Sequence, residues 1–393
     1  LNSQSPIPNP QLPTTNPNPP FFIFNSSFLI LNPQLPTPTF VESKNKEMIQ
    51  RFFPRIVVVE IILLLLVVLA GSVVRMTGSG MGCPDWPKCF GYLIPPTDVE
   101  QVTWGAGKSF RKGQMIVHDE ALWQAREDFT AGVELDLDHW EKYTRHDYAI
   151  FNAAHTWTEY INRLLGALSG VPMVILLVLS FTYIRTKPLV PLLAIFGVFG
   201  LGFEAWLGKV VVDGNLIPGQ ITYHMMMAIA LILAMILLRR ITLPAEKVFK
   251  RDVPNRLRNL TVIVILMMTA QIIMGTQVRE HVDHLVKEFG GHDRSGWIDQ
   301  MDVIFYVHRS FSLLILGILA YLAHQVKRNS LDLMGLRWAF WLVSLEVVSG
   351  AVLAYFEFPR YIQPLHLLLS VGVVMLLFDG ILKMSRVGNP SLK

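Results

Sequence analysis

Eight apolar runs divide the chain, and each is long enough to cross a membrane as a helix. They cover about 54–74, 155–184, 189–212, 220–238, 260–279, 303–324, 338–356 and 362–382. About 20 apolar residues in a helix span the roughly 30 Å hydrocarbon core of a bilayer. The pattern therefore predicts an all-α integral membrane protein with eight transmembrane helices.

The first four runs and the last four carry matching residues at matching positions. One set recurs with identical gaps of 4 and 16 residues, namely Glu204, Gly208 and His224 as Glu346, Gly350 and His366. Two shorter sets also match, Asn162-Arg163 with His308-Arg309, and Gly71–Arg75 with Gly275–Arg279. We therefore expect two pseudo-symmetric four-helix bundles. Because each has an even number of spans, both enter the membrane from the same side, as a parallel repeat.

Composition and charge place this repeat in a membrane and orient it. The chain is 52% hydrophobic and 16% charged, with a mean hydropathy of +0.41, which excludes an ordinary soluble domain. Lys and Arg collect near both ends of the membrane region and in alternate connections, which predicts cytoplasmic termini. The net charge of +4 is mostly this topological signal. No interleaving of aromatic and basic residues indicates nucleic acid, so the lipid bilayer is the expected surrounding.

Four segments follow from these patterns. The stretch before Met48 is rich in Pro, Asn, Ser and Thr and has too little apolar sequence to fold, so we expect a disordered or non-native extension. The predicted segments are this extension at 1–47, a first half at 48–240 with a long outer connection at 75–150, a basic cytoplasmic linker at 241–258, and a second half at 259–393.

Beyond its two cysteines, the outer connection holds Trp104, Trp123, Trp140 and many charges, so we predict one or two amphipathic helices lying over the membrane face, which could form a lid. The cysteines are Cys83 and Cys89. Six residues apart and outside the membrane, they are placed to form a disulfide in an oxidising compartment. A redox-active dithiol and two independent thiols are the alternatives. A metal site is less favoured, because two cysteines alone rarely complete one.

The eleven histidines fall into two groups by position. Seven lie in outer loops or at a cytoplasmic helix end, where a solvated side chain is expected: His118, His139, His146, His281, His284, His292 and His324. Four lie at or just inside the outer ends of predicted helices: His155, His224, His308 and His366. Ionisable groups inside a membrane are expensive and tend to mark function.

His308 and His366 lie at similar depths in neighbouring helices of the second half, which makes them a candidate pair of axial ligands to a haem iron. Core histidines bonded to Ser, Thr or backbone carbonyls are the alternative. The first half is not an exact copy. His224 matches His366, but the counterpart of His308 is Asn162, which is a poor iron ligand.

The first half instead has polar side chains along one face of its second helix: His155, Glu159, Asn162 and Arg163. Residues three and four apart project to the same side of a helix. Glu159 and Arg163 could pair only with each other. Beside a single histidine inside an apolar bundle, however, they also suit a reaction site with an open iron position.

These residues carry a family resemblance. The run Gly71-Ser-Val-Val-Arg-Met-Thr-Gly-Ser-Gly-Met-Gly-Cys-Pro-Asp-Trp-Pro-Lys-Cys-Phe-Gly91 resembles the outer-loop signature of the haem A synthases. The segment Glu159-Tyr-Ile-Asn-Arg-Leu-Leu-Gly166 looks like that family's Glu-x-x-His-Arg motif, with Asn162 where most members have a histidine. The similarity continues through His224, His308-Arg309 and His366 and covers about 48–386.

The resemblance implies an oxidoreductase that converts a methyl group of haem O to a formyl group, giving haem A for cytochrome oxidase. It implies haem b on His308 and His366 in the second half, and haem O in the first half with His224 as its iron ligand. It also implies catalytic roles near Glu159, which is placed to move protons, with Asn162 and Arg163 beside it. The bacterial branch has the outer disulfide, here Cys83 with Cys89.

The implied setting is the bacterial cytoplasmic membrane. Candidate partners beside haem O and haem A are haem O synthase, the cytochrome oxidase subunits, an electron donor or acceptor, and a second copy of the chain. Two other classes stay open from the residues alone. One is a dihaem b-type electron carrier, which would favour four equivalent ligands. The other is a non-enzymatic oxidase assembly factor, which would hold no haem.

Overall fold

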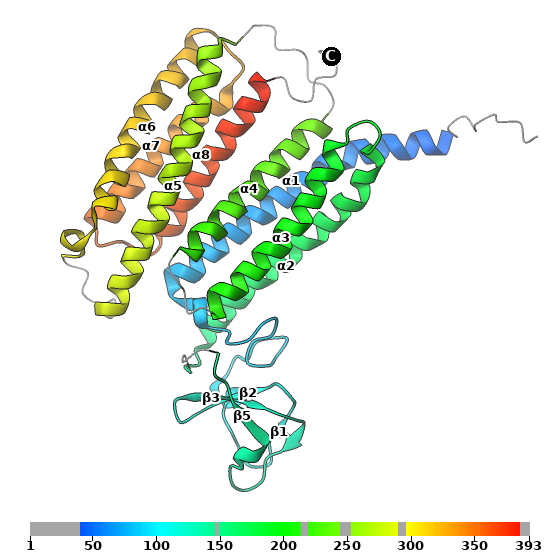
Figure 1. The fold of residues 1–393 in the computed structure, drawn as a ribbon, viewed down its shortest axis with the longest axis vertical. Coiled ribbons are helices and arrows are strands. Elements are labelled where there is room, and N and C mark those ends of the chain that lie inside the picture. Colours follow the sequence, from blue (N-terminus) through cyan, green and yellow to red (C-terminus); the bar gives the residue numbers. More distant parts are fainter. Residues whose placement is uncertain (1–39, 146–148, 214–218, 244–252, 290–295, 386–393) are drawn as a thin grey trace, which may run out of the picture. The chain divides into compact units, whose positions relative to one another are not determined.

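A computed structural model describes residues 40–145, 149–213, 219–243, 253–289 and 296–385 (Figure 1). The chain separates into Leu1–Lys44, of which only the first turn of a helix is described, and Asn45–Lys393, which contains everything that follows. Most of the predicted extension 1–47, the middle of the predicted linker, and His146 and His292 lie outside the described residues.

Eight helices are long and apolar enough to cross a membrane, which confirms the predicted fold class. They are α1 Phe40–Thr77, α2 Ala153–Ser180, α3 Leu189–Asp213, α4 Gln220–Thr242, α5 Asn255–Phe289, α6 Val303–Arg328, α7 Met334–Tyr355 and α8 Ile362–Met384. Helices satisfy all their backbone hydrogen bonds internally, which is why apolar runs of this length take that form in lipid.

One helix is longer than its apolar run. The run predicted to end near residue 279 continues as α5 to Phe289, so His281 and His284 lie on a helix and not in an outer loop. The extension is polar and amphipathic, and its apolar side is buried at Val282 and Leu285 against Trp297 and Phe358. Hydropathy alone ends the span too early, because this turn of α5 is covered by protein and not by lipid.

Helices adjacent in sequence pack against each other, from α2 to α4 and from α5 to α8, and α5 closes the second group by contacting α8 (Figure 1). Small residues allow close approach, as is usual between helices in membranes. A Cβ on Gly380 of α8 would lie 2.4 Å from Leu336 Cδ1 of α7, and one on Gly200 of α3 would lie 2.7 Å from Leu231 Cδ2 of α4.

The two halves also meet. α4 contacts both α5 and α8, and one hydrophobic core runs through both halves. At the outer end, Asp283 of α5 binds Arg75 of α1 through one carboxylate oxygen, and binds Arg279 at 2.7 Å through the other. The two arginines of the repeated Gly71–Arg75 and Gly275–Arg279 segments therefore share one carboxylate at the junction.

The prediction of amphipathic helices in the outer connection is wrong. The described part of this segment contains five short strands, and its helical pieces are single 3-10 turns: β1 Ser109–Phe110, β2 Met115–His118, β3 Ala121–Ala125, β4 Phe129–Thr130 and β5 Trp140–Lys142. The strands form an antiparallel sheet in the order β2-β3-β5 and a separate β1-β4 pair.

The strands have an aromatic core of their own. Trp140 is 1% exposed and packs edge-on against Phe110 and Phe129, with ring centroids 4.9 and 5.3 Å away. The tryptophans that suggested a membrane-facing surface are part of this core or pack against it. The aromatic side chains that suggested a helix lying on lipid are therefore packed in or against this core, while Leu93, Ile94 and Val133 of the same segment are exposed.

Candidate functional site

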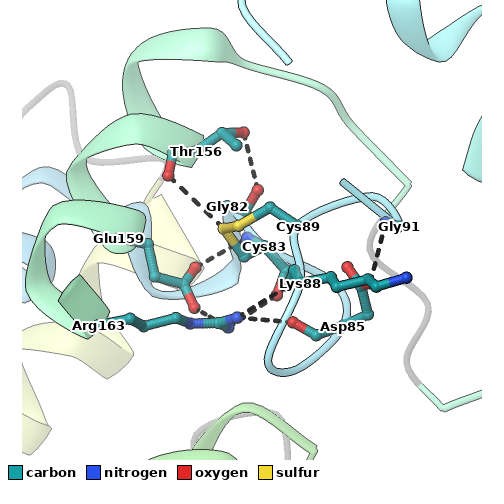
Figure 2. The surroundings of a disulfide bond; sticks show 9 residues. All are labelled: Gly82, Cys83, Asp85, Lys88, Cys89, Gly91, Thr156, Glu159 and Arg163. Atoms are coloured by element: carbon teal, nitrogen blue, oxygen red, sulfur yellow. Dashed lines mark hydrogen bonds and ion pairs between the residues drawn. A yellow bond between two sulfur atoms is a disulfide. The ribbon is translucent and has the colours of Figure 1, made fainter. Parts of the chain in front are cut away.

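The outer cysteines form a disulfide, as predicted, with their Cα atoms 4.7 Å apart (Figure 2). The loop that they close lies against the outer end of α2. Thr156 donates a hydrogen bond to the Gly82 carbonyl at 2.8 Å, and a Cβ at Gly82 would lie 2.6 Å from the backbone carbonyl carbon of His155. Only a glycine fits at this contact.

Glu159 and Arg163 fasten the same loop to α2 (Figure 2). Glu159 is 3% exposed; one carboxylate oxygen accepts a hydrogen bond from the Cys83 N–H at 2.8 Å, and the other binds Arg163. Arg163 also donates to the backbone carbonyls of Cys83, Asp85 and Lys88, at 3.1, 2.6 and 3.2 Å. The two residues do pair with each other, and the pair forms an anchor for the disulfide loop.

Asp85 is a buried carboxyl within this loop. One oxygen accepts the Gly91 N–H at 2.9 Å, and the other has no partner among the described residues. Burial raises the pKa of Asp85, against the opposing effects of backbone N–H groups and of the Arg163 charge. The loop therefore contains one carboxyl whose charged form is disfavoured.

The second half brings His308 and His366 together. Their ring centroids are 6.4 Å apart and the ring planes are inclined by 71°. Gly275 and Gly350 make room for the rings, since a Cβ at either position would lie only 3.2 or 3.3 Å from the nearest imidazole Cε1. This accounts for two of the repeated glycines: each faces the histidine of a neighbouring helix.

The hydrogen bonds of His366 leave its Nε2 nitrogen free. Ser349 donates its hydroxyl proton to the Glu346 carbonyl at 2.8 Å, so its oxygen accepts the proton on His366 Nδ1, at 2.9 Å. The Nε2 lone pair is then available to a ligand. His308 Nδ1 is buried without a hydrogen-bond partner in the described structure, although Gln271 holds the His308 backbone carbonyl at 2.9 Å.

These two histidines fit a haem iron. A metal–nitrogen bond of about 2 Å on either side, plus the distance from each nitrogen to its ring centre, separates the centres of two axial imidazoles by about 6 Å. In the described residues there is no cluster of three or more His, Cys, Asp or Glu side chains that could hold a metal ion. A macrocycle brings four nitrogens of its own, so two histidines are enough for it.

The first half differs at each equivalent position. Asn162 lies near Gly71, whose Cβ would be 3.7 Å from the Asn162 side-chain oxygen, and this oxygen is buried without a partner in the described part of the chain. A Cβ at Gly208 would meet nothing within 4 Å. His224 therefore does not lie against Gly208 in the way that His366 lies against Gly350.

His224 instead contacts Glu204, with its Nδ1 2.5 Å from a carboxylate oxygen. The two side chains are in contact without the alignment of a hydrogen bond. Within the described residues, no hydrogen bond or ion pair links His224 to Glu159, Asn162 or Arg163. Glu204 and Glu346 are equivalent in the repeat, but only the Glu204 carboxylate contacts its histidine, a difference that the spacing of the repeat does not predict.

The other histidines differ in their surroundings, and His155 has a buried Nδ1 with no hydrogen-bond partner in the described part of the chain. His139 lies 3.0 Å from Glu127 and stacks on Phe129, while His281 lies 3.2 Å from Asp302 and is only 24% exposed. The solvated-side-chain prediction is therefore wrong for His281, which helix α5 turns toward the chain. His284 and His324 are exposed, as expected.

The fold and these contacts define a class: a multi-pass membrane protein with a repeated set of histidines in its helices and a loop closed by a disulfide. The family model of the cytochrome oxidase assembly proteins matches residues 54–125 and 133–378. The chain belongs to the cytochrome oxidase assembly protein family.

Three bacterial relatives are similar to most or half of the chain, and each is named Heme A synthase. The protein of Bartonella tribocorum is 24% identical over 88% of this chain and 94% of its own length. That of Flavobacterium psychrophilum is 21% identical over 77% and 89%. That of Shewanella oneidensis is 24% identical over 55% of this chain, and the match spans about half of its length, 54%.

Proposed function

We propose that this chain is a haem A synthase, an oxidoreductase that converts one ring methyl group of haem O to a formyl group for cytochrome oxidase. Family membership and the names of the three relatives support this. The observation that carries it is the inequality of the halves. His308 and His366 face each other, whereas the equivalent His224 has Asn162 in the place of a second histidine.

In the second half, His308 and His366 are the residues that would hold haem b. Haem b bound there supplies one-electron transfer. Ser349 keeps the His366 proton on Nδ1, and Gly275 and Gly350 leave space for both rings. Because two histidines would hold the group, this site would be suited to moving electrons and not to binding a further ligand.

In the first half, His224 would hold the iron of the substrate, haem O, and Asn162 would leave the opposite side open. Glu159 is the candidate proton acceptor. Both of its oxygens are held, one by the Cys83 N–H and the other by Arg163. A proton on either oxygen would weaken the bonds that hold the disulfide loop, because it removes the negative charge that attracts Arg163 and the Cys83 N–H, so proton uptake and the position of the loop are coupled.

The surroundings follow from the same residues. A disulfide at Cys83 and Cys89 suits an oxidising compartment, so we place the outer segment on the periplasmic or external side of a bacterial cytoplasmic membrane, with cytoplasmic termini. Haem O synthase, the cytochrome oxidase subunits and an electron donor or acceptor are the partners that this reaction requires.

The test is to express the chain in cells that make haem O but no haem A, and to identify extracted haems by chromatography and mass. We expect haem A from the wild type and none from the His224→Ala variant. A protein that binds haem b without forming haem A would instead be a dihaem electron carrier. A purified protein with no haem absorption would be an assembly factor, and either result would refute the proposal.

A further inference from the structure

His224 and His366 occupy equivalent positions but have chemically different neighbours. His366 Nδ1 contacts the Ser349 hydroxyl at 2.9 Å, and Glu346 is held by Ser370. His224 Nδ1 contacts the Glu204 carboxylate directly, at 2.5 Å. One histidine of the repeat thus has a neutral partner, and the other has a charged one.

The sequence explains this difference. The repeat relates the two halves by 142 positions, so the counterpart of Ser349 is Leu207 and that of Ser370 is Ala228. Neither hydroxyl exists in the first half. Glu204 therefore has no serine to hold it, His224 has no serine to accept its proton, and the two side chains contact each other. Glu204 is largely shielded, with an 11% exposed side chain, so its charge is only weakly screened by water.

Glycine packing gives an independent sign that the rings are placed differently. The His366 ring lies close enough to Gly350 for a Cβ there to be 3.3 Å away, but nothing lies within 4 Å of a Cβ at Gly208. Contact with Glu204 thus accompanies a different ring position, which leaves space beside Gly208.

We propose that Glu204 is a positioning residue for His224, which makes this imidazole a stronger electron donor than His366. The inference rests on the proposed function. The charge of a carboxylate 2.5 Å from Nδ1 favours the proton on that nitrogen, leaves Nε2 for the substrate's iron and raises the basicity of the ligand. A stronger donor favours ferric over ferrous iron. The substrate site therefore has a histidine, His224, whose carboxylate partner favours ferric iron. The electron-transfer site has a histidine, His366, whose partner is a neutral hydroxyl.

The test compares Glu204→Gln with Glu346→Gln in full-length protein whose second half is already filled with haem b. Ferric and ferrous haem b, and then haem O, are titrated into the first site. Loss of an outer partner of a metal ligand weakens binding by about 10–100-fold, so we expect such a loss for ferric haem in Glu204→Gln and a smaller one for ferrous haem. Each tenfold by which the loss of ferric haem affinity exceeds the loss of ferrous haem affinity raises the midpoint potential of the haem in the first site by about 59 mV.

Glu346→Gln should leave both the first site and the haem b spectrum unchanged, because Ser349 remains the partner of His366. The haem b content of the second half also reports on folding of each variant. In a His224→Ala background, Glu204→Gln should have no further effect on haem binding, because Glu204 acts through His224.

The outcomes separate this inference from the proposed function. If His224→Ala abolishes binding but Glu204→Gln binds both iron states like the wild type, the inference is refuted and the substrate site stands. An equal loss from Glu204→Gln with and without His224 also refutes it, since the carboxylate would then act on the bundle. If His224→Ala itself changes nothing, the substrate site has been assigned wrongly and the inference falls with it.

Discussion

Replacing Gly275 by alanine should displace His308 from its position and weaken haem b binding without unfolding the helix. A Cβ there would lie 3.2 Å from His308 Cε1, while carbon atoms prefer separations of about 3.5–4.0 Å. The ring must move by at least about 0.3 Å, which exceeds the roughly 0.2 Å tolerance of a metal–ligand bond. Alanine is favoured over glycine in a helix by about 1 kcal/mol, which offsets much of the packing cost of about 1–3 kcal/mol.

The assay is the ratio of haem to protein after purification, together with the spectrum of the reduced protein and the melting temperature. We expect partial haem loss for Gly275→Ala and nearly complete loss for Gly275→Val, with Gly350→Ala resembling Gly275→Ala because its Cβ would be 3.3 Å from His366. Gly208→Ala and Gly208→Val are matched controls, since nothing lies within 4 Å of a Cβ there. Full haem content in Gly275→Val would refute the reasoning.

Three further predictions concern the outer loop. Gly82→Ala should release the disulfide loop from α2, because its Cβ would lie 2.6 Å from the backbone of His155. Gly105→Ala is the control, since nothing lies within 4 Å of a Cβ there, and limited proteolysis of the loop should distinguish the two variants. Arg163→Lys loses the guanidinium hydrogen bonds to three loop carbonyls, so reduction of the disulfide by a thiol reagent should become at least tenfold faster. Arg309→Lys, at the equivalent position of the second half, should leave this rate unchanged. Because burial raises the pKa of Asp85 above its usual 3.8, loop stability should fall as the pH rises from below 3.8 through that raised pKa, and Asp85→Asn should flatten this change in amide hydrogen exchange.

The spans could be predicted from the sequence because lipid imposes a single rule on every helix: a continuous apolar run of sufficient length. No such rule applies to the outer segment, and its hairpin turn lacks the residues by which such turns are usually recognised. β2 and β3 form a hairpin whose turn residues, Asp119 and Glu120, both have positive φ, at 48° and 55°. Such turns normally contain glycine or asparagine, so the usual Asn-Gly or Asp-Gly signature was missing. The strands that follow are held by an aromatic core assembled from distant residues.

The sequence was sufficient to predict which residues form the candidate site but not which of them contact each other. The spacing of the repeat placed His308 and His366 on neighbouring helices at similar depth, and the structure brings them together. The same spacing made Glu204 and Glu346 look equivalent. The two carboxylates differ because Ser349, one turn after Glu346, has Leu207 as its counterpart after Glu204. A search for identical residues in the two halves does not consider positions such as these, where the halves differ.

The disulfide loop and Glu159 belong to one arrangement that the second half cannot form. The counterpart of Glu159 is Phe305, which offers no acceptor for a backbone N–H, and the counterpart of Arg163 is Arg309, which lies over the Tyr306 ring. An outer loop at that position would leave its N–H groups and carbonyls without partners, which is costly in a buried contact. The long outer connection and the Glu159–Arg163 pair therefore depend on each other. A substitution at either residue changes the position of the loop as well as the charge beside the proposed substrate site, so loop position must be measured together with activity in every variant of this pair.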